Sequence, residues 1–195
     1  MEIISDILYW ISTGLLVPVI IILILLFIRS LLLIGSFFGQ YLAIHKSASQ
    51  VRKALTGVTR ENVDAVIERL PKKSDMLVNR YIKAIIEAKD EPAEIQRLLA
   101  EYEIEADKDL TTSKMLAKLG PMMGLMGTLI PMGPALAGLA SGDIDSMARN
   151  MQVAFATTVT GLVAAAIGYV TQQIKQRWYL QDITNLEYLY EILQK

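Results

Sequence analysis

The sequence contains no cysteine and only one histidine among its 195 residues. The lack of cysteine excludes disulfide frameworks, thiolate metal sites and cysteine nucleophiles. The histidine, His45, has no carboxylate or second histidine at ligand spacing, so we interpret it as a structural residue and predict no metal site. Charge is missing as well from three long runs, because 15–28, 119–140 and 150–173 contain no Asp, Glu, Lys or Arg.

Motifs for nucleotide binding and catalysis are also missing. Neither a GxxxxGK[ST] loop nor a GxGxxG turn between a strand and a helix occurs, so an ATPase is not expected. Ser141-Gly142-Asp143 could supply a nucleophile only with a base on the same face, and none accompanies it. The net charge is -1 and there is no long basic tract, which gives no reason to expect nucleic acid as a partner. We therefore expect neither enzymatic activity nor a cofactor.

The residues that are present are strongly apolar and unevenly distributed. Hydrophobic residues make up 53% of the chain and the mean hydropathy is +0.38, more than is usual for a water-soluble domain. Of the 39 acidic and basic residues, 25 lie within 40–111. A helix needs about 20 apolar residues to cross a membrane, and 119–140 and 150–173 are both long enough. The sequence therefore predicts a membrane protein with one charged cytosolic insert.

The first membrane span is predicted from about residue 11 to the mid-thirties, with Arg29 extending toward lipid headgroups or a neighbouring helix. Residues 2–10 hold no basic residue, so we expect this end to remain as an anchor. Basic residues gather at one end of each span: Lys46, Arg52 and Lys53, then Lys108, Lys114 and Lys118, then Lys175 and Arg177. By the positive-inside rule, the N-terminus is expected outside and the C-terminus in the cytosol, across the cytoplasmic (inner) membrane.

Helical periodicity continues outside the spans. Apolar residues recur every three or four positions in the charged insert and in the tail, which predicts an all-α protein whose long helices extend into a cytosolic helical region. Gly57 and Thr59 are expected to divide 51–70 into two short helices, with Pro71 ending the second. Pro92 is expected in the first turn of a long helix that rises into the membrane.

Six parts are predicted along the chain. They are the N-terminal region with the first span (1–39), the cytosolic helical insert (40–111), the second span (112–141), an external loop (142–149), the third span (150–177) and a cytosolic C-terminal helix (178–195).

The second span is unusually rich in glycine and proline. Pro131 and Pro134 each remove a helical N–H donor and free a carbonyl one turn earlier, which a membrane tolerates only beside protein or water. Gly120 and Gly124 form a GxxxG pair and, with Gly127, allow another helix to approach closely. Helix packing alone would also explain these glycines and prolines. Two interpretations therefore stay open: a span adapted only for packing, and a span whose freed carbonyls face water or another protein chain.

The third span carries hydroxyl groups on a helix of small residues. Thr157, Thr158 and Thr160 fall within four positions, just before Gly161. Together with the second span, they predict a wall of small and hydroxyl-bearing residues along which an ion or a water chain could move. Neither 119–140 nor 150–173 contains an acidic or basic residue, so if ions pass, the carboxylate that carries them must come from another subunit.

Two motifs give this pattern a resemblance to a known family. Gly-Leu-Met-Gly-Thr-Leu at 124–129 and Phe-Ala-Thr-Thr-Val-Thr-Gly-Leu at 155–162 resemble the second-span and third-span motifs of the MotA/TolQ/ExbB proton channel family. The three-span layout is similar to the ExbB and TolQ branch. The resemblance implies a homopentameric ring whose pore holds two copies of a single-span subunit like ExbD, TolR or MotB. The aspartate of that subunit would carry a proton or sodium ion, and the ion gradient would drive mechanical work.

Individual roles carry over by position. Thr128 and Thr158 match the two threonines that face the pore in the family, whereas Thr160 falls where ExbB-like proteins are usually apolar. The extra hydroxyls of Thr157 and Thr160 raise the hypothesis of sodium coordination. Val153 stands where ExbB carries a glutamate, so a direct proton role is lost at that position. The leading hypothesis is therefore an ion-conducting, stator-type subunit, and a non-conducting membrane scaffold or interaction protein is the alternative.

Overall fold

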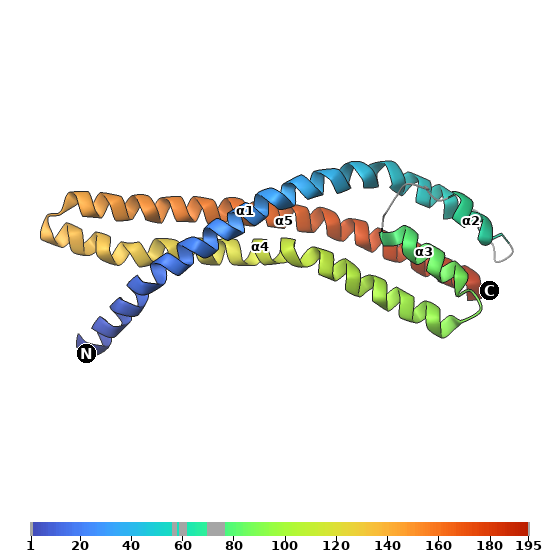
Figure 1. The fold of residues 1–195 in the computed structure, drawn as a ribbon, viewed down its shortest axis with the longest axis horizontal. Coiled ribbons are helices and arrows are strands. Elements are labelled where there is room, and N and C mark those ends of the chain that lie inside the picture. Colours follow the sequence, from blue (N-terminus) through green and yellow to red (C-terminus); the bar gives the residue numbers. More distant parts are fainter. Residues whose placement is uncertain (1, 56–57, 59–61, 70–76, 195) are drawn as a thin grey trace. The chain divides into compact units, whose positions relative to one another are not determined.

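The computed structural model describes residues 2–55, 58, 62–69 and 77–194. The described residues form helices and no strands, which confirms the all-α prediction. The helices are α1 (Glu2–Leu55), α2 (Asp64–Arg69), α3 (Leu77–Glu87), α4 (Pro92–Ser141) and α5 (Ile144–Gln194) (Figure 1).

Three of these helices are long and apolar enough to cross a membrane. They are α4, α5 and the part of α1 over Tyr9–Leu42. The predicted three-span helical membrane architecture is therefore confirmed. Pro92 is the first residue of α4, in the position expected from the sequence.

The long helices continue beyond the predicted membrane spans. α1 continues without a break to Leu55, well past the mid-thirties. α5 begins at Ile144, so most of the external loop predicted over 142–149 is helical, and the third span continues as one helix through the tail. The expected helix break at Gly57 and Thr59 and the expected stop at Pro71 lie outside the described residues.

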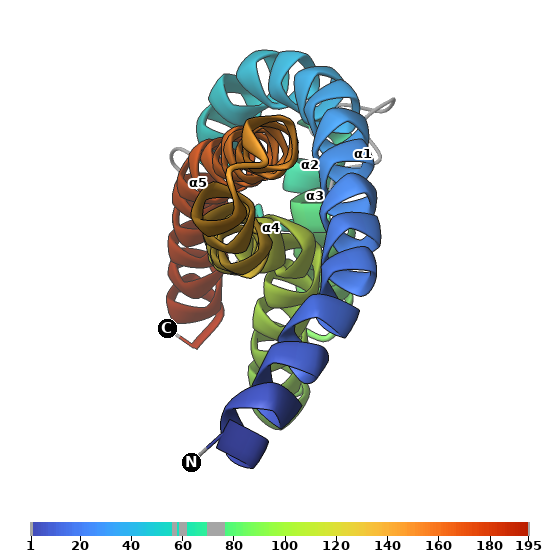
Figure 2. The ribbon, with the colours of Figure 1, turned by 90° about the vertical axis from the view of Figure 1, so that its left-hand side faces the viewer.

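The turn between α4 and α5 consists of two residues, and Figure 2 looks directly onto it. Gly142 has a φ of 77°, and the N–H groups of Gly142 and Asp143 donate to the carbonyls of Leu139 and Gly138. This paired arrangement ends a helix at a glycine because glycine has no β-carbon to oppose a positive φ. The Asp143 carboxylate then accepts a hydrogen bond of 2.9 Å from the N–H of Ser146, which caps α5. As a result, α4 and α5 form a tight antiparallel hairpin.

The chain consists of two compact units. The first, here termed the membrane unit, comprises Met1–Ile34 and Thr112–Gln172. The second, here termed the charged unit, comprises Gly35–Thr111 and Gln173–Lys195.

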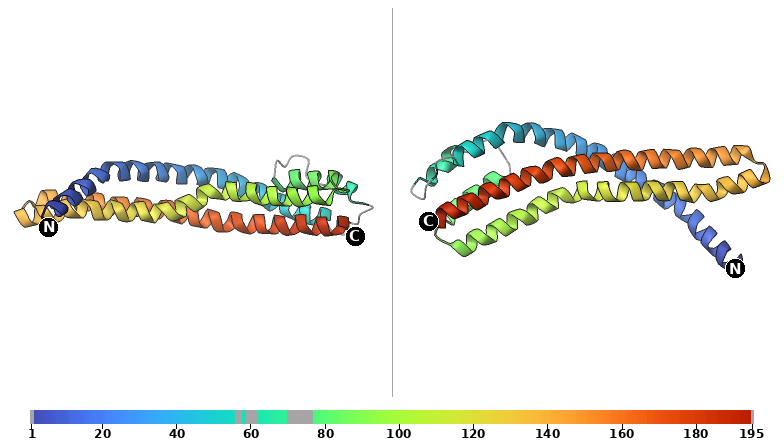
Figure 3. Two further views of the ribbon diagram at one scale, coloured as in Figure 1. Left: turned by 90° about the horizontal axis from the view of Figure 1, so that it is seen from below. Right: turned by 180° about the vertical axis from the view of Figure 1, so that it is seen from behind.

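In the membrane unit, α4 and α5 lie side by side, and α1 crosses them obliquely (Figures 1 and 3). Leu26 and Leu33 of α1 are buried together with Leu116 of α4. Around these three pack Met115, Leu119, Met123 and Ile167. The other faces of the helices expose large apolar side chains, which is the surface that a bilayer solvates.

In the charged unit, a separate hydrophobic core joins segments from all five helices. Ile82 and Ile85 of α3, Tyr102 of α4 and Leu186 of α5 are fully buried in it. The recurring apolar residues of the C-terminal tail, which is the last part of α5, therefore pack against partner helices. Burial of a Leu or Ile side chain contributes about 1.5–3 kcal/mol, so this core can hold the short helix α3 in place.

Candidate functional site

The membrane unit brings α4 and α5 together at glycines. A β-carbon added at Gly161 would lie 2.5 Å from the carbonyl oxygen of Gly120 and 2.9 Å from the Cα of Gly124. A β-carbon at Gly120 would lie 2.7 Å from the carbonyl oxygen of Gly161. These distances are shorter than van der Waals contact and involve backbone atoms, so only glycine fits at both positions. The predicted packing glycines of the two spans lie opposite one another.

Thr157 lies at the same contact, farther along the helix pair. A β-carbon added at Gly127 would lie 2.6 Å from the Cβ of Thr157. The Thr157 side chain is buried, and its hydroxyl donates to the carbonyls of Val153 and Ala154, at 3.0 and 2.9 Å. Within one chain, Thr157 therefore fills the space that Gly127 leaves open.

The other three threonines of the predicted site are partly exposed. Thr128 donates to the carbonyl of Leu125 at 2.7 Å, Thr158 to that of Ala154 at 3.1 Å, and Thr160 to that of Ala156 at 2.8 Å. Each hydroxyl proton is thus used by the residue's own helix, as is common for threonine in membrane helices. The oxygen lone pairs remain, so each group can act as an acceptor toward a cation or a protonated carboxyl.

The register of the hairpin relates Thr128 to Thr158. A β-carbon at Gly124 would contact the backbone of Thr158 at 3.5 Å, and Thr128 comes four residues after Gly124. The two threonines are therefore about one helical turn apart along the pair, or about 5 Å. An ion that moved along this wall would meet two hydroxyl oxygens in succession, and 119–140 and 150–173 would offer it no acidic or basic side chain.

The prolines lie within α4 without ending it. Pro131 is buried and Pro134 is partly exposed. Because proline lacks an N–H, the carbonyls of Gly127 and Ile130 have no partner four residues later. In hydrocarbon such carbonyls need protein or water, so this part of α4 offers two further acceptors next to Thr128.

Sequence reasoning missed one polar contact inside the membrane unit. Thr171 and Ser113 are buried, with 3.2 Å between their hydroxyl oxygens. Gly168 also packs closely, since a β-carbon there would lie 2.6 Å from the backbone nitrogen of Ala117. In the sequence, these residues are marked only by residue type and helical spacing. Which of them meet depends on the register between α4 and α5, and only the three-dimensional structure shows that register.

The charged unit contains a second polar group of residues. The ammonium of Lys175 lies 2.8 Å from a carboxylate oxygen of Asp109, and the Tyr179 hydroxyl donates to the same oxygen at 2.6 Å. The Lys175 side chain is 3% exposed, against 37% for Asp109. Burial, together with the hydrogen bond to Asp109, raises the pKa of Tyr179 above its ordinary value, so this hydroxyl remains a proton donor. The pair links α4 to α5.

Next to this pair, the Tyr102 hydroxyl donates to Asp182 at 3.1 Å. Burial raises the pKa of the Asp182 carboxyl from 3.8 to about 6, although the hydrogen bond from Tyr102 partly opposes that shift. The pKa of Tyr102 itself is raised by burial and by the neighbouring Asp182. The two tyrosine rings, Tyr102 and Tyr179, meet edge to face, with 6.4 Å between their centroids.

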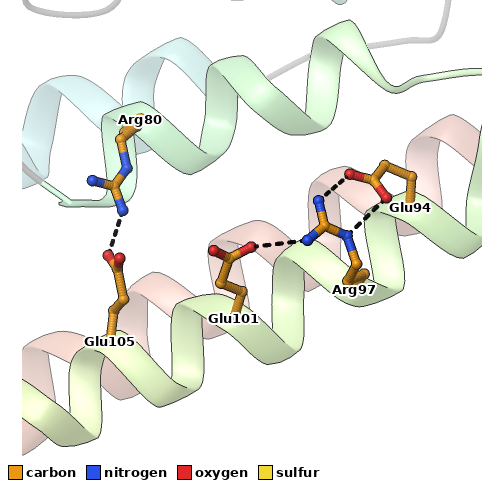
Figure 4. Close-up of polar contacts among 5 residues, drawn as sticks. All are labelled: Arg80, Glu94, Arg97, Glu101 and Glu105. Carbon is orange, nitrogen blue, oxygen red and sulfur yellow. Dashed lines mark hydrogen bonds and ion pairs between the residues drawn. The ribbon is translucent and has the colours of Figure 1, made fainter.

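The outer surface of the charged unit carries ordinary ion pairs (Figure 4). Arg80 of α3 binds Glu105 of α4, whereas Arg97 binds Glu94 through its Nε at 2.9 Å and approaches Glu101 at 3.6 Å. The arginine side chains are largely exposed and the glutamates partly so, and exposed pairs contribute little to stability. They are therefore not part of a candidate site.

A family model decides the assignment, because the model of the MotA/TolQ/ExbB proton channel family matches residues 72–187, more than half of the chain. The chain belongs to this family. The match covers α3, α4 and most of α5, so it includes both helices that form the candidate site. No curated protein and no solved structure matches the chain.

Membership in the MotA/TolQ/ExbB family fits the architecture. The chain is a multi-pass membrane protein with a proton-channel-type role, as the family and the three apolar helices indicate. Among the described residues, no group of three or more His, Cys, Asp or Glu side chains could hold a metal ion. Because the family is a proton channel family, the wall of threonines, glycines and prolines on α4 and α5 is the candidate ion pathway.

Proposed function

We propose that this chain is the ring-forming subunit of an ion-driven motor, in which an aspartate of a single-span partner carries the ion past the α4–α5 wall. The observation that supports this proposal is the combination of hydroxyl and carbonyl acceptors with a complete lack of acids and bases in 119–140 and 150–173. A wall of this kind lowers the barrier for a cation but cannot store one by itself. The missing carboxylate has to come from another chain.

The assembly follows from the resemblance to the ExbB and TolQ branch. We expect five copies of the chain around a pore and two copies of an ExbD-, TolR- or MotB-like partner inside it. Basic residues near the ends of the spans, such as Lys114, Lys118 and Arg177, support a cytosolic charged unit and an N-terminus outside the cytoplasmic membrane. The long helices α4 and α5 then connect the channel mechanically to the cytosolic side.

The transported ion is a proton or sodium. A proton would be held by the partner's carboxyl group, whereas sodium requires several oxygen ligands. Thr128, Thr158 and Thr160 keep their oxygen lone pairs available, which suits sodium as well as a protonated carboxyl. Flux measurements under separate proton and sodium gradients distinguish the two.

The test is Thr158→Val, which keeps the shape of the side chain and removes its oxygen. The complex with the partner is reconstituted in liposomes, and ion flux is recorded with a pH-sensitive or sodium-sensitive dye. Loss of one hydrogen-bonding group costs about 1 kcal/mol, so we expect flux to fall about fivefold while the complex still assembles.

Thr184→Val is the matched control. Thr184 is exposed on α5 in the charged unit, and its hydroxyl also donates to a carbonyl four residues earlier, that of Leu180 at 2.9 Å. This variant should conduct like the wild type. Unchanged flux in Thr158→Val would remove the role assigned to that hydroxyl.

The scaffold alternative also has an observation in its favour. Every threonine of the wall already donates to its own helix, and Gly120, Gly127 and Gly161 are fully explained by packing. In a scaffold, liposomes that contain the chain with a co-expressed partner would show no flux above empty liposomes. The partner's intramembrane aspartate could then be changed to asparagine without effect.

A further inference from the structure

Asp182 is a partly buried carboxylate on the part of α5 that belongs to the charged unit. Its neighbours in the sequence do not indicate its surroundings, but in the fold it faces Tyr102 of α4. The Tyr102 hydroxyl donates to it at 3.1 Å, and the Tyr102 side chain is fully buried in the core. One side of the carboxylate therefore meets a hydrophobic core and not water.

The nearest buried cation is already committed to another acid. Lys175, on the same helix, forms an ion pair with Asp109, which also accepts a hydrogen bond from Tyr179. Among the residues that the structure describes, Asp182 has no ion-pair partner. Its negative charge is thus stabilised by one neutral donor only, and burial raises its pKa to about 6.

Further ionisable groups lie beyond Tyr102 and around Trp178. Tyr81 of α3 meets the Tyr102 ring edge to face at 5.3 Å. Arg80 lies over the Tyr81 ring at 5.1 Å and is paired with Glu105 of α4. From α1, the described ionisable side chain that approaches this part of α5 is Tyr41, whose ring lies 6.0 Å from that of Trp178.

We propose that Asp182 is a reversible proton-binding site of the charged unit, and that protonation of its carboxyl tightens the packing of α4 on α5 there. An ionised carboxylate at the edge of a hydrophobic core, without a counter-ion, has an unfavourable free energy of desolvation. The neutral acid removes this penalty and still offers an acceptor oxygen to Tyr102. The proton-bound form is therefore the better packed one.

The direction of the pH effect follows from the raised pKa. The contribution of Asp182 to stability is fully present below its ordinary pKa of 3.8 and is lost as the pH rises through about 6. The site does not depend on ion conduction. If the charged unit lies in the cytosol, as proposed above, it would respond to acidification of the cytosol.

Trp178 provides a local reporter for the test. It lies four residues before Asp182, one helical turn away, and stacks on Phe37 with 5.6 Å between the ring centroids. The chain has two tryptophans, so Trp10→Phe leaves Trp178 as the single emitter. Emission of this full-length protein in nanodiscs is recorded from about pH 4.5 to 8.5, and pH-difference infrared spectra of the carboxyl band report protonation directly.

We expect one transition in both signals, with a midpoint near pH 6. It should disappear when Asp182→Asn is added. Tyr102→Phe should move the midpoint to higher pH, because the hydrogen bond from Tyr102 favours the charged form. Glu187→Gln changes an exposed acid of the same helix and should leave the transition unchanged.

Three results would overturn the proposal. One is a midpoint near the ordinary pKa of aspartate. Another is a transition that persists in Asp182→Asn. The third is a carboxyl band that titrates near pH 6 while Trp178 emission stays constant, which would show protonation without any effect on packing. Should Asp182→Asn fail to fold, the shift in Tyr102→Phe decides the matter alone, and no shift there contradicts the assignment.

Discussion

Glycines in the membrane unit have two different surroundings. Gly161 lies against the backbone of α4, whereas Gly14 of α1 has nothing within 4 Å of the place where a β-carbon would stand. Both are helical, so they share the same conformational cost of glycine relative to alanine. The difference between them is the close approach of a second helix.

The two positions should therefore respond oppositely to alanine. Gly161→Ala forces apart two backbones that cannot move independently, and we expect a loss of about 1–3 kcal/mol in stability. Gly14→Ala should be neutral or stabilising by about 0.5–1 kcal/mol, because alanine favours the helix. The measurement is the thermal unfolding midpoint of each purified variant in the same lipid nanodisc. Equal midpoints for the two variants would show that the α4–α5 contact is looser than these distances imply.

The pair of Lys175 and Asp109 is one of the polar links between α4 and α5 in the charged unit. Removing either partner leaves the other without its counter-charge, but the two remaining groups differ in access to water. The Lys175 side chain is 3% exposed, and that of Asp109 is 37% exposed. An unpaired Asp109 can therefore be hydrated and keeps its bond from Tyr179, whereas an unpaired Lys175 stays buried.

We expect Asp109→Asn to destabilise the protein more than Lys175→Met, each by about 1–3 kcal/mol. The double variant should be more stable than Asp109→Asn alone, since it removes the buried charge together with its partner. Chemical denaturation in detergent, followed through Trp178 emission, measures all three. The reverse order of the two single variants would mean that Lys175 reaches water more easily than its burial indicates.

Much of the helical architecture is predictable from hydropathy and period. The three spans and the start of α4 at Pro92 follow from apolar runs about 20 residues long and from the fixed φ of proline. The continuation of the Pro92 helix into the second span also follows from its unbroken period. The exact residues at which the other polar segments join the spans do not follow, because charged and apolar helical turns have the same backbone. For this reason the unbroken α1 and the helical start of α5 at Ile144 differ from the predicted parts.

The polar residues of the membrane unit and those of the charged unit differ in how well a single sequence predicts them. Thr128 and Thr158 stand out because hydroxyls are rare in an apolar run, so residue type alone identifies them as candidates. Asp109 lies among many charged residues and Asp182 on a helix with scattered ones, and a solvated face is the usual interpretation of both patterns. Their burial depends on which side α4 and α5 turn toward each other, and helical period cannot fix that without the partner helix.

For the protein as a whole, the exposed apolar surface of the membrane unit raises the question of what covers it. Leu125 and Leu129 of α4 and Phe155 and Val159 of α5 are each at least 60% exposed in the single chain. Lipid can cover such side chains, but the candidate ion wall lies on the same two helices, and a wall that conducts has to be shielded from lipid. In the proposed ring, neighbouring copies of the chain would provide that shield.

We therefore expect native mass spectrometry of the purified complex to give a ring of five copies, about 108 kDa from a chain of 21.7 kDa, with two partner chains added when the partner is co-expressed. The number five is what the family resemblance implies, and the physical requirement is that enough hairpins of α4 and α5 surround the pore to separate it from lipid. The control is Leu32→Ala, a change at an exposed position of α1 that should leave the number of copies unchanged, because we expect α1 outside such a ring. A monomer or a two-fold dimer that persists in several lipids, with the partner present, would contradict the ring. Thr128 and Thr158 would then be packing residues, and the scaffold would be the better account of the whole molecule.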